Sequence, residues 1–531
     1  MTSLQKSLID GLPTDHLVRK WWENRLHALD DVPWPAGPVP SELDARRKRG
    51  GEGRVDRTVL MEALRRQYAE AGLAEPVRLD ALARPDARTV TTGHQLCLAT
   101  GPAFTVYKAL TTLHLARQLE TRWGTPVIPV FWLASEDHDF EEIRSLWDGA
   151  EWHSWSSDEA GGAVGRMSTE KAADTLTAWA RAAGLDQATV DRVVSASSGT
   201  LSQAMRRWIH DVLGQDLLVL DGDDPQLKAA FADRMVQDIE EGTLHTEVSR
   251  VNAVLESAGH APQVHVRETN LFHLGEEGRH RLVQHGEGWS AGNTTWESTA
   301  ALVGAVRARP ADFSPNALFR PLYQAFLLPD VAVVGGLAEV AYWLQLSTAH
   351  AAFRLPAPAL VPRDGARIAP RPWMELAGRL GIGQDHLGEP LEVWESRWLS
   401  GQDVPDVRAW RKAMDREADQ ARTAFVGVDA TLSGSVEAAR AKIHKLLDKL
   451  EGQGRRAIRR GHADELTELA RLHGWFHPEG VAQERVANVH ALSASWTGAE
   501  PLMAMLDRSF LEGHRGEVWS PVLHELLDTG P

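Results

Sequence analysis

Four ionisable side chains stand in a row at Glu136, Asp137, His138 and Asp139, directly after an apolar run at residues 127–133. Such crowding is costly unless a ligand, a metal ion or water relieves it. An imidazole beside a carboxylate suits general-base catalysis toward an amine, and carboxylates with a histidine also suit Mg²⁺ held together with substrate phosphates. A solvated acidic turn that caps the next helix is the alternative. We predict catalytic roles for Asp137 and His138 and substrate contacts for Glu136 and Asp139, and we assign no metal ion to protein ligands alone.

A second cluster is the segment TGHQLCLATGP at residues 92–102. It lies between a short predicted strand and a predicted helix, where α/β proteins bind ligands and where helix N-termini favour anions. We predict that Gln95 binds substrate and that His94 is catalytic. Gly93, Gly101 and Lys108 are candidates for holding the phosphates of a cofactor. An ordinary tight turn with a surface histidine is an equal alternative, and the spacing excludes a Walker loop.

A third cluster extends from residue 314 to residue 345. Arg320 is a candidate for a bidentate contact with a carboxylate or phosphate, although a structural salt bridge would explain it nearly as well. Gly335 and Gly336 directly follow a predicted strand and permit close approach of a ligand to the backbone. The remaining substrate-binding candidates of this cluster are Asn316, Glu339, Tyr342 and Trp343. Arg363, after a later strand, is a further candidate for a cofactor phosphate.

The elements that position these clusters are predicted from apolar patterning. Residues 89–92 and 127–133 predict buried strands, and residues 102–123 between them predict a helix with Pro102 at its start. This is a βαβ unit, the opening of a doubly wound α/β domain. Further strands are predicted at residues 217–220, 331–334 and 359–361. The Rossmann-like core is expected over residues 1–400, with a connecting insertion at roughly 145–310.

The later part of the chain predicts helices. Apolar residues recur at helical spacing between residues 436 and 472, as in a coiled-coil seam. We expect a helical arm over residues 401–475 and a C-terminal segment, residues 476–531, that returns to the core. Self-association through the arm and an intramolecular hairpin are equally compatible with the pattern.

Composition limits the function classes. The chain has 531 residues and a net charge of −16, which argues against a broad nucleic-acid interface. Residues 1–22 lack the apolar core of a signal peptide, and no apolar run is long enough to span a membrane, so we expect a cytoplasmic protein. Cys97 is the single cysteine, which excludes an intrachain disulfide. We expect it to fill space in the core.

The clusters, in this order, resemble the bacillithiol biosynthesis cysteine-adding enzymes, a family of putative cysteine ligases. The resemblance depends on TGHQLCLATGP (92–102), PVFWLASEDHDFEE (129–142), SPNALFRPLYQ (314–324), GGLAEVAYWLQL (335–346) and GVAQERV (480–486). It implies a Rossmann-type core like that of class I aminoacyl-tRNA synthetases, and a coiled-coil arm linked to homodimer formation. The implied reaction joins the carboxyl group of cysteine to the amine of glucosaminyl-malate.

A synthetase-like core implies activation of the cysteine carboxylate by ATP, with Mg²⁺ as a further candidate. In that scheme the 93–102 turn and Arg363 hold phosphates, and Asp137 or Glu339 binds the ammonium group of cysteine. His138 takes the proton of the attacking amine, and Arg320 with Asn316 holds the malate carboxylates. Two alternatives stay open: a nucleotidyltransferase that acts on a small acid or sugar phosphate, and a non-catalytic coiled-coil scaffold.

Overall fold

The computed structural model describes residues 9, 12–26, 32–35, 37, 39–48, 54–402, 406–496, 498, 500–513 and 523–527. Residues 1–8, 10 and 11, which belong to the N-terminal segment in which no signal peptide is predicted, lie outside the described residues. The chain divides into two compact units. Unit 1 comprises Met1–Ile368 and Glu484–Pro531, and unit 2 comprises Ala369–Gln483.

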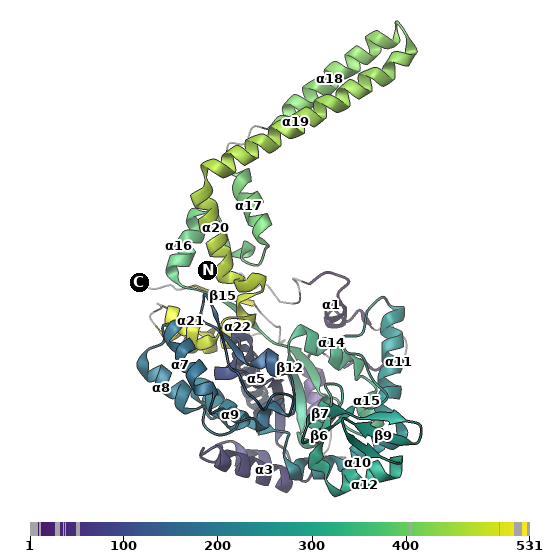
Figure 1. Ribbon diagram of the computed structural model, residues 1–531, viewed down its shortest axis with the longest axis vertical. Coiled ribbons are helices and arrows are strands. Elements are labelled where there is room, and N and C mark those ends of the chain that lie inside the picture. Colours follow the sequence, from purple (N-terminus) through teal and green to yellow (C-terminus); the bar gives the residue numbers. More distant parts are fainter. Residues whose placement is uncertain are drawn as a thin grey trace. The chain divides into compact units, whose positions relative to one another are not determined.

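The centre of unit 1 is a five-stranded parallel sheet with the order β13-β12-β1-β2-β5, and Figure 1 labels its strand β12. Its strands are β1 (Arg88–His94), β2 (Val127–Leu133), β5 (Leu218–Asp221), β12 (Asp330–Gly335) and β13 (Ala359–Pro362). All seven residues of β2 are buried, as expected for a central parallel strand. The predicted α/β class and Rossmann-like core are confirmed. The order reverses between β1 and β12, which makes this the switch point where such sheets bind ligands.

One face of the sheet is covered by α5 (Ala103–Trp123), the helix predicted after Pro102. Leu115 and Leu119 of α5 pack with Val90 of β1 and Val331 of β12 in one buried cluster. Gly124 ends the helix with φ +61°, a conformation that glycine adopts without the cost that a β carbon would add.

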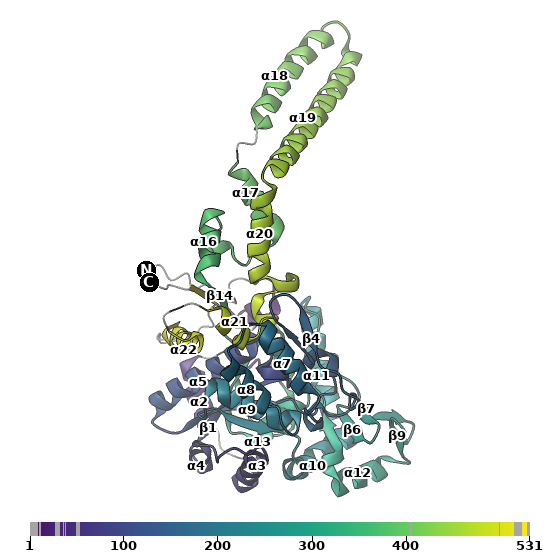
Figure 2. The same cartoon turned by 60° about the vertical axis from the view of Figure 1, so that its left-hand side comes forward.

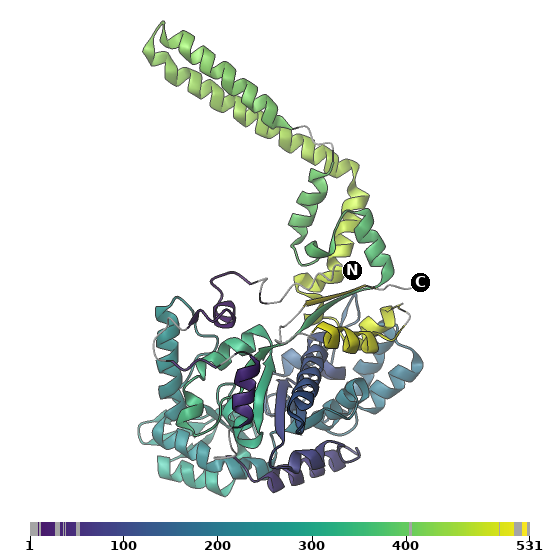
Figure 3. The same ribbon diagram turned by 180° about the vertical axis from the view of Figure 1, so that it is seen from behind.

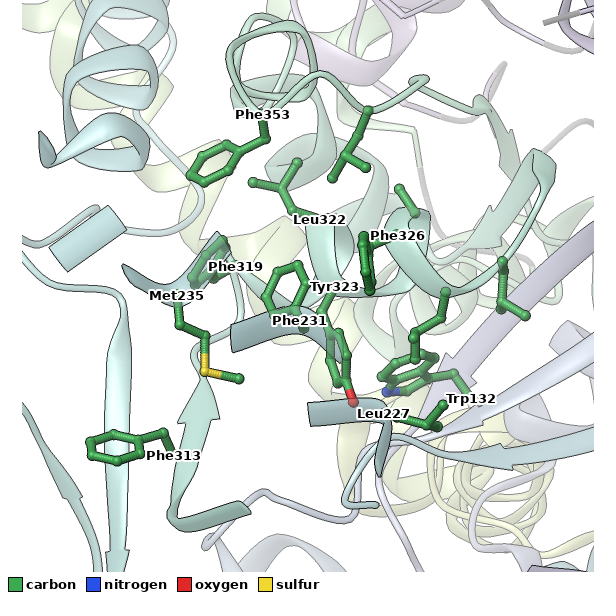
Figure 4. Close-up of a cluster of buried hydrophobic side chains, with 14 of the residues drawn as sticks. Trp132, Leu227, Phe231, Met235, Phe313, Phe319, Leu322, Tyr323, Phe326 and Phe353 are labelled. Atoms are coloured by element: carbon green, nitrogen blue, oxygen red, sulfur yellow. The ribbon is translucent and has the colours of Figure 1, made fainter. Parts of the chain in front are cut away.

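The other face carries the larger core. Ile128, Val130 and Trp132 alternate along β2, so all three point to this face. Figure 4 shows Trp132 beside Tyr323, with ring centroids 5.5 Å apart, and Phe231 next to Tyr323 at 4.7 Å. Full burial of such aromatic side chains contributes roughly 1.5–3 kcal/mol each. This core fixes the strand end from which the 136–139 cluster projects.

The range 145–310 expected as one insertion contains β5, so the chain leaves the sheet twice. Between β2 and β5 it forms α6 (Phe140–Ile143), β3 (Ser145–Trp147), β4 (Trp152–Ser154), α7 (Ala172–Ala182), α8 (Gln187–Ser195) and α9 (Leu201–Leu213). Between β5 and β12 it forms α10 (Pro225–Glu241), α11 (Thr243–Ser257), β6 (Leu271–Gly275), β7 (Gly278–Arg281), β8 (Val283–His285), β9 (Gly288–Ala291), β10 (Thr294–Trp296), α12 (Thr299–Ala308), β11 (Phe313–Pro315) and α13 (Arg320–Leu327). Figure 2 shows β6, β7 and β9 on the same side of unit 1 as α10 and α12.

Further elements complete unit 1. They are α1 (Leu17–Trp22), α2 (Pro40–Arg47), α3 (Arg57–Glu70), α4 (Leu79–Ala83), α14 (Leu337–Gln345), α15 (Ala349–Ala352), β14 (Gly365–Ala369), α21 (Val489–Ser495), α22 (Leu502–Gly513) and β15 (Leu523–Leu527). β14 and β15 form a two-stranded sheet, and α22 contacts α5. Residues from 484 onward are therefore grouped with the core.

Unit 2 is helical and extends beyond the arm expected over 401–475. It contains α16 (Arg371–Arg379), α17 (Leu391–Ser400), α18 (Val407–Val426), α19 (Ser433–Gly461) and α20 (Ala463–Phe476). Helices α18 and α19 form an antiparallel hairpin, which Figures 1 and 3 show. Asp415 accepts hydrogen bonds from both Arg440 (2.7 Å) and His444 (2.9 Å) across the pair. Within the described part of the chain, no helix is both long enough and apolar enough to cross a membrane.

Candidate functional site

The loop after β2, the β6–β7 hairpin and the start of α13 meet around a cavity of about 320 Å³ in unit 1. This is the size of a small-molecule site. Its lining comes from the end of β2 and the following loop, from the β6–β7 hairpin and from α13 and α14: Trp132, Ala134, Glu136, Asp137, Val264, His265, Phe272, Arg279, Arg281, Pro315, Asn316, Ala317, Arg320 and Tyr342. Five of the predicted substrate-site or catalytic residues are among them.

Asp137 is held in place by the neighbouring loop. The amide of Gln95 donates to Asp137 Oδ2 at 3.0 Å and also to Glu142 Oε2. The backbone N–H of His138 donates to Asp137 Oδ1 at 2.8 Å. Burial by itself raises the pKa of Asp137, but these hydrogen bonds and the charge of Arg279 outweigh it and hold the pKa below its ordinary value. Asp137 therefore presents an ionised carboxylate to the cavity at neutral pH.

The imidazole of His138 lies beside the cavity, 45% exposed. Its Nδ1 accepts a hydrogen bond from Arg279 Nη1 at 3.3 Å and lies 3.5 Å from Asp137 Oδ1. Arg279 belongs to β7, and its guanidinium also donates to Ser314 Oγ (3.1 Å) and to the carbonyl oxygen of Pro315 (2.9 Å). The same group lies over the ring of Phe272, 3.9 Å from its centroid. His138 is thus joined to the insertion as well as to the sheet.

Glu136 points into a buried network of charges. Its Oε1 is 2.7 Å from Nζ of Lys228, which also contacts Asp223 at 2.7 Å. Burial raises the pKa of Glu136, the charge of Lys228 opposes this, and that of Asp223 adds to it. Glu136 lines the cavity, but its carboxylate is paired with the buried Lys228. Its main contact in this structure is therefore with the protein.

Arg320 and Tyr342 also line the cavity. The guanidinium of Arg320 donates to Gln324 Oε1 (2.9 Å) and to the hydroxyl of Tyr342 (3.3 Å). It also lies over the indole of Trp132, 5.8 Å from the ring centroid. Burial raises the pKa of Tyr342, so its hydroxyl stays protonated. These partners are neutral, which leaves the positive charge of Arg320 available to an anion.

Asn316 has a structural as well as a lining role. Its Oδ1 accepts from the backbone N–H groups of Leu318 and Phe319, and its amide donates to Asn270 Oδ1 at 3.0 Å. These bonds fix the turn that leads into α13 and thereby the position of Arg320.

A partly buried ion pair joins α5 to the start of α14 at the switch point. Nζ of Lys108 lies 2.7 Å from Glu339 Oε2 and donates to the carbonyl oxygen of Gly93. Glu339 Oε2 also accepts from the backbone N–H of Gly336 at 2.8 Å. Burial lowers the pKa of Lys108, and the contact with Glu339 opposes that shift. The predicted phosphate ligand Lys108 is therefore already neutralised by a carboxylate.

A second buried pair joins Arg363 to Glu484, the glutamate of the late GVAQERV segment. Arg363 Nη1 donates to Glu484 Oε2 at 3.0 Å, Nη2 donates to Oε1, and the guanidinium lies over the ring of Phe104. Burial lowers the pKa of Arg363, but Glu484 outweighs burial and raises it. His94 packs edge-on against Phe104, and its pKa is well below the ordinary value because of burial and the nearby charges of Lys108 and Arg363. His94 is thus a neutral, packed imidazole.

The N-terminus of α5 is covered by the returning chain. Ala103 N–H donates to the carbonyl oxygen of Ala487 at 2.8 Å, and the amide of Asn488 donates to the carbonyl oxygens of Ala99 and Gly101. Gly101 has φ +72°, and a β carbon there would lie 2.4 Å from that of Cys97. The sequence predicted an anion site at this turn, and in the structure the N–H of Ala103 is bonded to the protein itself. The physical reason is the C-terminal segment, whose return to this position no local pattern specifies.

Comparison with protein families accounts for both units. A family model described as "Bacillithiol biosynthesis BshC, N-terminal Rossmann-like domain" matches residues 40–364. A second, described as "Bacillithiol biosynthesis BshC, C-terminal coiled-coil domain", matches residues 369–497. The chain belongs to the BshC family. The resemblance inferred from the sequence motifs is confirmed.

Relatives named "Putative cysteine ligase BshC" match along most of their length. That of Cytophaga hutchinsonii is 30% identical over 475 residues, covering 85% of this chain and 87% of the relative. That of Salinibacter ruber is 31% identical over 473 residues, covering 82% and 84%. That of Geobacillus kaustophilus is 29% identical over 487 residues, covering 84% and 88%.

Six of the predicted catalytic and substrate-binding residues of this BshC-family chain are not among the lining residues: His94, Gln95, His138, Asp139, Glu339 and Trp343. Asp139 caps α6, where its side chain accepts from the N–H of Glu142. Trp343 is 3% exposed, and it packs in a separate core with Val340 and Leu344. Asp139 and Trp343 are close in sequence to the lining residues Asp137 and Tyr342. Neighbouring positions on a turn or helix, however, point in different directions. Cys97 is buried as expected, and burial raises the pKa of its thiol to about 12.

The cavity of this BshC-family chain also contains residues that the motifs did not indicate. Arg279, Arg281 and Phe272 come from the β6–β7 hairpin, and His265 comes from the segment before it. The available signal was the short pattern of polar and aromatic residues around Gly278. A β carbon at Gly278, which has φ +123°, would lie 2.5 Å from the carbonyl oxygen of Gly161. This glycine therefore allows the hairpin to approach the loop that sets the position of Arg279.

Proposed function

We propose that this chain is a ligase that joins the carboxyl group of cysteine to the amine of glucosaminyl-malate, the last step of bacillithiol biosynthesis. The observation that carries the proposal is the composition of the cavity. An ionised carboxylate, Asp137, and three guanidinium groups, Arg279, Arg281 and Arg320, line one space of about 320 Å³. An acceptor with two carboxylates and a substrate with an ammonium group need this combination of charges. The family membership and the names of the relatives support the same reaction.

Within this proposal, each wall has a role. Arg320 and Arg281 bind the malate carboxylates, with Asn316 fixing the turn before α13. Asp137, held by Gln95, binds the ammonium group of cysteine. His138 lies next to Asp137, with its Nδ1 3.5 Å from Asp137 Oδ1, beside the place where the new bond forms. Most of the rate comes from positioning and from charges fixed before reaction.

ATP is part of the proposal because a free carboxylate does not form an amide in water without activation. Three of the predicted phosphate contacts already have protein partners in the observed arrangement. Lys108 and Arg363 are each paired with a carboxylate, and the N-terminus of α5 is covered by Ala487. We therefore route no step through these residues. The requirement for ATP and Mg²⁺ is tested by leaving them out.

Homodimer formation through the arm is a further part of the proposal. An apolar groove of about 420 Å³ follows the α18–α19 hairpin, lined by Met414, Ala421, Phe425 and Ile443 among others. Phe425 is 51% exposed. Light scattering after gel filtration should give twice the chain mass of 58.5 kDa, and the Phe425→Glu variant should give the monomer mass. A monomeric wild-type protein would refute this part.

The experiment for the ligase is mass spectrometry of the purified protein with cysteine and glucosaminyl-malate, with and without ATP and Mg²⁺. We expect a product with the mass of both substrates less one water, formed only when ATP is present. Product without ATP would retain the ligase and refute ATP activation. A product that keeps a nucleotide would favour a nucleotidyltransferase. Absence of product in every arm would refute the proposal for these substrates.

A further inference from the structure

The contact between Arg279 and His138 has a chemical consequence that follows from proton counting. A guanidinium carries five N–H donors, has no acceptor and stays protonated in proteins. The nitrogen that receives its hydrogen bond must therefore offer a lone pair. In His138 that nitrogen is Nδ1, 3.3 Å from Arg279 Nη1. In the neutral imidazole the hydrogen then resides on Nε2, because each neutral ring has one donor and one acceptor nitrogen.

Asp137 competes for the same nitrogen. Its Oδ1 lies 3.5 Å from His138 Nδ1, slightly farther than Arg279 Nη1. A carboxylate accepts only, so this contact would favour a hydrogen on Nδ1. Asp137 Oδ1, however, already accepts from the backbone N–H of His138 at 2.8 Å, and Oδ2 accepts from Gln95. Arg279 thus opposes the tautomer that the adjacent aspartate would otherwise select.

Arg279 can determine the tautomer of His138 because several contacts with the protein hold its guanidinium group in place. Its Nε and Nη2 donate to Ser314 and Pro315 of β11, and its guanidinium plane lies over Phe272 of β6. Its own backbone N–H donates to Gly161 at 2.9 Å. A donor fixed in this way needs no reorganisation when it meets the imidazole.

We propose that Arg279 is a positioning residue that holds neutral His138 in the tautomer with hydrogen on Nε2, so that His138 acts as a hydrogen-bond donor beside the cavity and not as a general base. This revises the role that the sequence predicted for His138. The natural recipient is the oxygen that gains negative charge when the amine attacks the activated cysteine carboxyl group. The tautomer itself does not depend on the proposed function; only the identity of that oxygen rests on it.

Nitrogen NMR on the full chain labelled with ¹⁵N-histidine tests the proposal without substrate. The signals of His138 are assigned from their loss in the His138→Gln variant. We expect Nε2 of the wild-type protein to carry the hydrogen and Nδ1 to be unprotonated at a pH where the ring is neutral. In Arg279→Met, which removes the donor but keeps a long side chain, we expect the populations to reverse toward hydrogen on Nδ1. Wild-type protein with hydrogen on Nδ1 would overturn the proposal, whether or not the variant folds.

Two further variants separate positioning from structural damage. Arg279→Lys keeps a cationic donor and should retain more of the wild-type tautomer than Arg279→Met. Arg281→Met is the matched control, because Arg281 lies on the same hairpin and over the same Phe272 ring at 5.3 Å. It should leave the tautomer of His138 unchanged. An unchanged tautomer in folded Arg279→Met, or an equal change in Arg281→Met, would refute the role of Arg279. Failure of the ligase assay would leave these spectra unaffected, so the two proposals fail separately.

Discussion

The buried pair between Arg363 and Glu484 predicts how firmly the returning C-terminal segment is held to the core. Replacing Glu484 by glutamine keeps the shape of the side chain but leaves Arg363, which is 7% exposed, without its countercharge. Breaking a buried pair on one side costs about 3–5 kcal/mol. The N–H of Ala103 donates to Ala487 in this segment, so its exchange with solvent reports the opening of the segment. A loss of about 3 kcal/mol speeds exchange through this opening by roughly 100-fold.

Hydrogen exchange followed by mass spectrometry of the peptide around residue 103 measures this effect. The double variant Arg363→Met, Glu484→Met should exchange more slowly than Glu484→Gln, because an apolar pair leaves no buried charge. Asp158→Asn, at an exposed ion pair with Lys171, is the matched control and should show no measurable change. Exchange in Glu484→Gln within about threefold of the wild type would refute the reasoning, since it corresponds to well under 1 kcal/mol.

Three other changes have defined outcomes. Burial raises the pKa of Asp330 from its ordinary value of 3.8 to about 6. The folded state therefore binds the carboxyl proton of Asp330 more tightly than the unfolded state does, and the protein loses stability as the pH rises from about 4 to about 6. The unfolding free energy of Asp330→Asn relative to wild type should therefore rise between pH 4 and pH 7, by up to about 3 kcal/mol in urea titrations; a constant difference would contradict it. Arg320→Met should raise KM for glucosaminyl-malate ~10-fold or more in steady-state assays, with a smaller change in kcat; an unchanged KM would exclude Arg320 from binding. Phe231→Ala should lower the unfolding free energy by about 3–5 kcal/mol in urea titrations, because it empties part of the core in Figure 4, whereas a loss below 1 kcal/mol would show that the core collapses around the gap.

The sheet and the first half of the site could be predicted because their signals are local. The apolar run that became β2 is buried at every position, and Gly124 ends α5 where the pattern does. Since parallel strands end at one edge, residues that directly follow β1 and β2 had to meet there. Gln95 and Asp137, 42 positions apart, do so through a hydrogen bond.

The rest of the site depends on contacts between distant segments. Arg279 reaches His138 across 141 positions, and Glu484 reaches Arg363 across 121. Nothing in the spacing around either residue specifies its partner. The positive charges of Lys108 and Arg363 suggested that both residues bind an anion. In the structure each of them is buried beside a carboxylate of the protein, which neutralises its charge. Without knowledge of these partners, the sequence indicates only the chemical type of the two cations.

The hydrogen bonds from Asn488 to Ala99 and Gly101 also constrain the timing of biosynthesis. The turn contains two residues with positive φ, Ala99 at 46° and Thr100 at 71°, a conformation that needs support from its surroundings. Asn488, which bonds to this turn, lies 389 positions after Ala99 and 387 positions after Gly101 in the chain. At the usual speed of translation the nascent turn waits about 20–80 s for Asn488 to be synthesised. The connection between β1 and α5 is therefore completed only after Asn488 has left the ribosome.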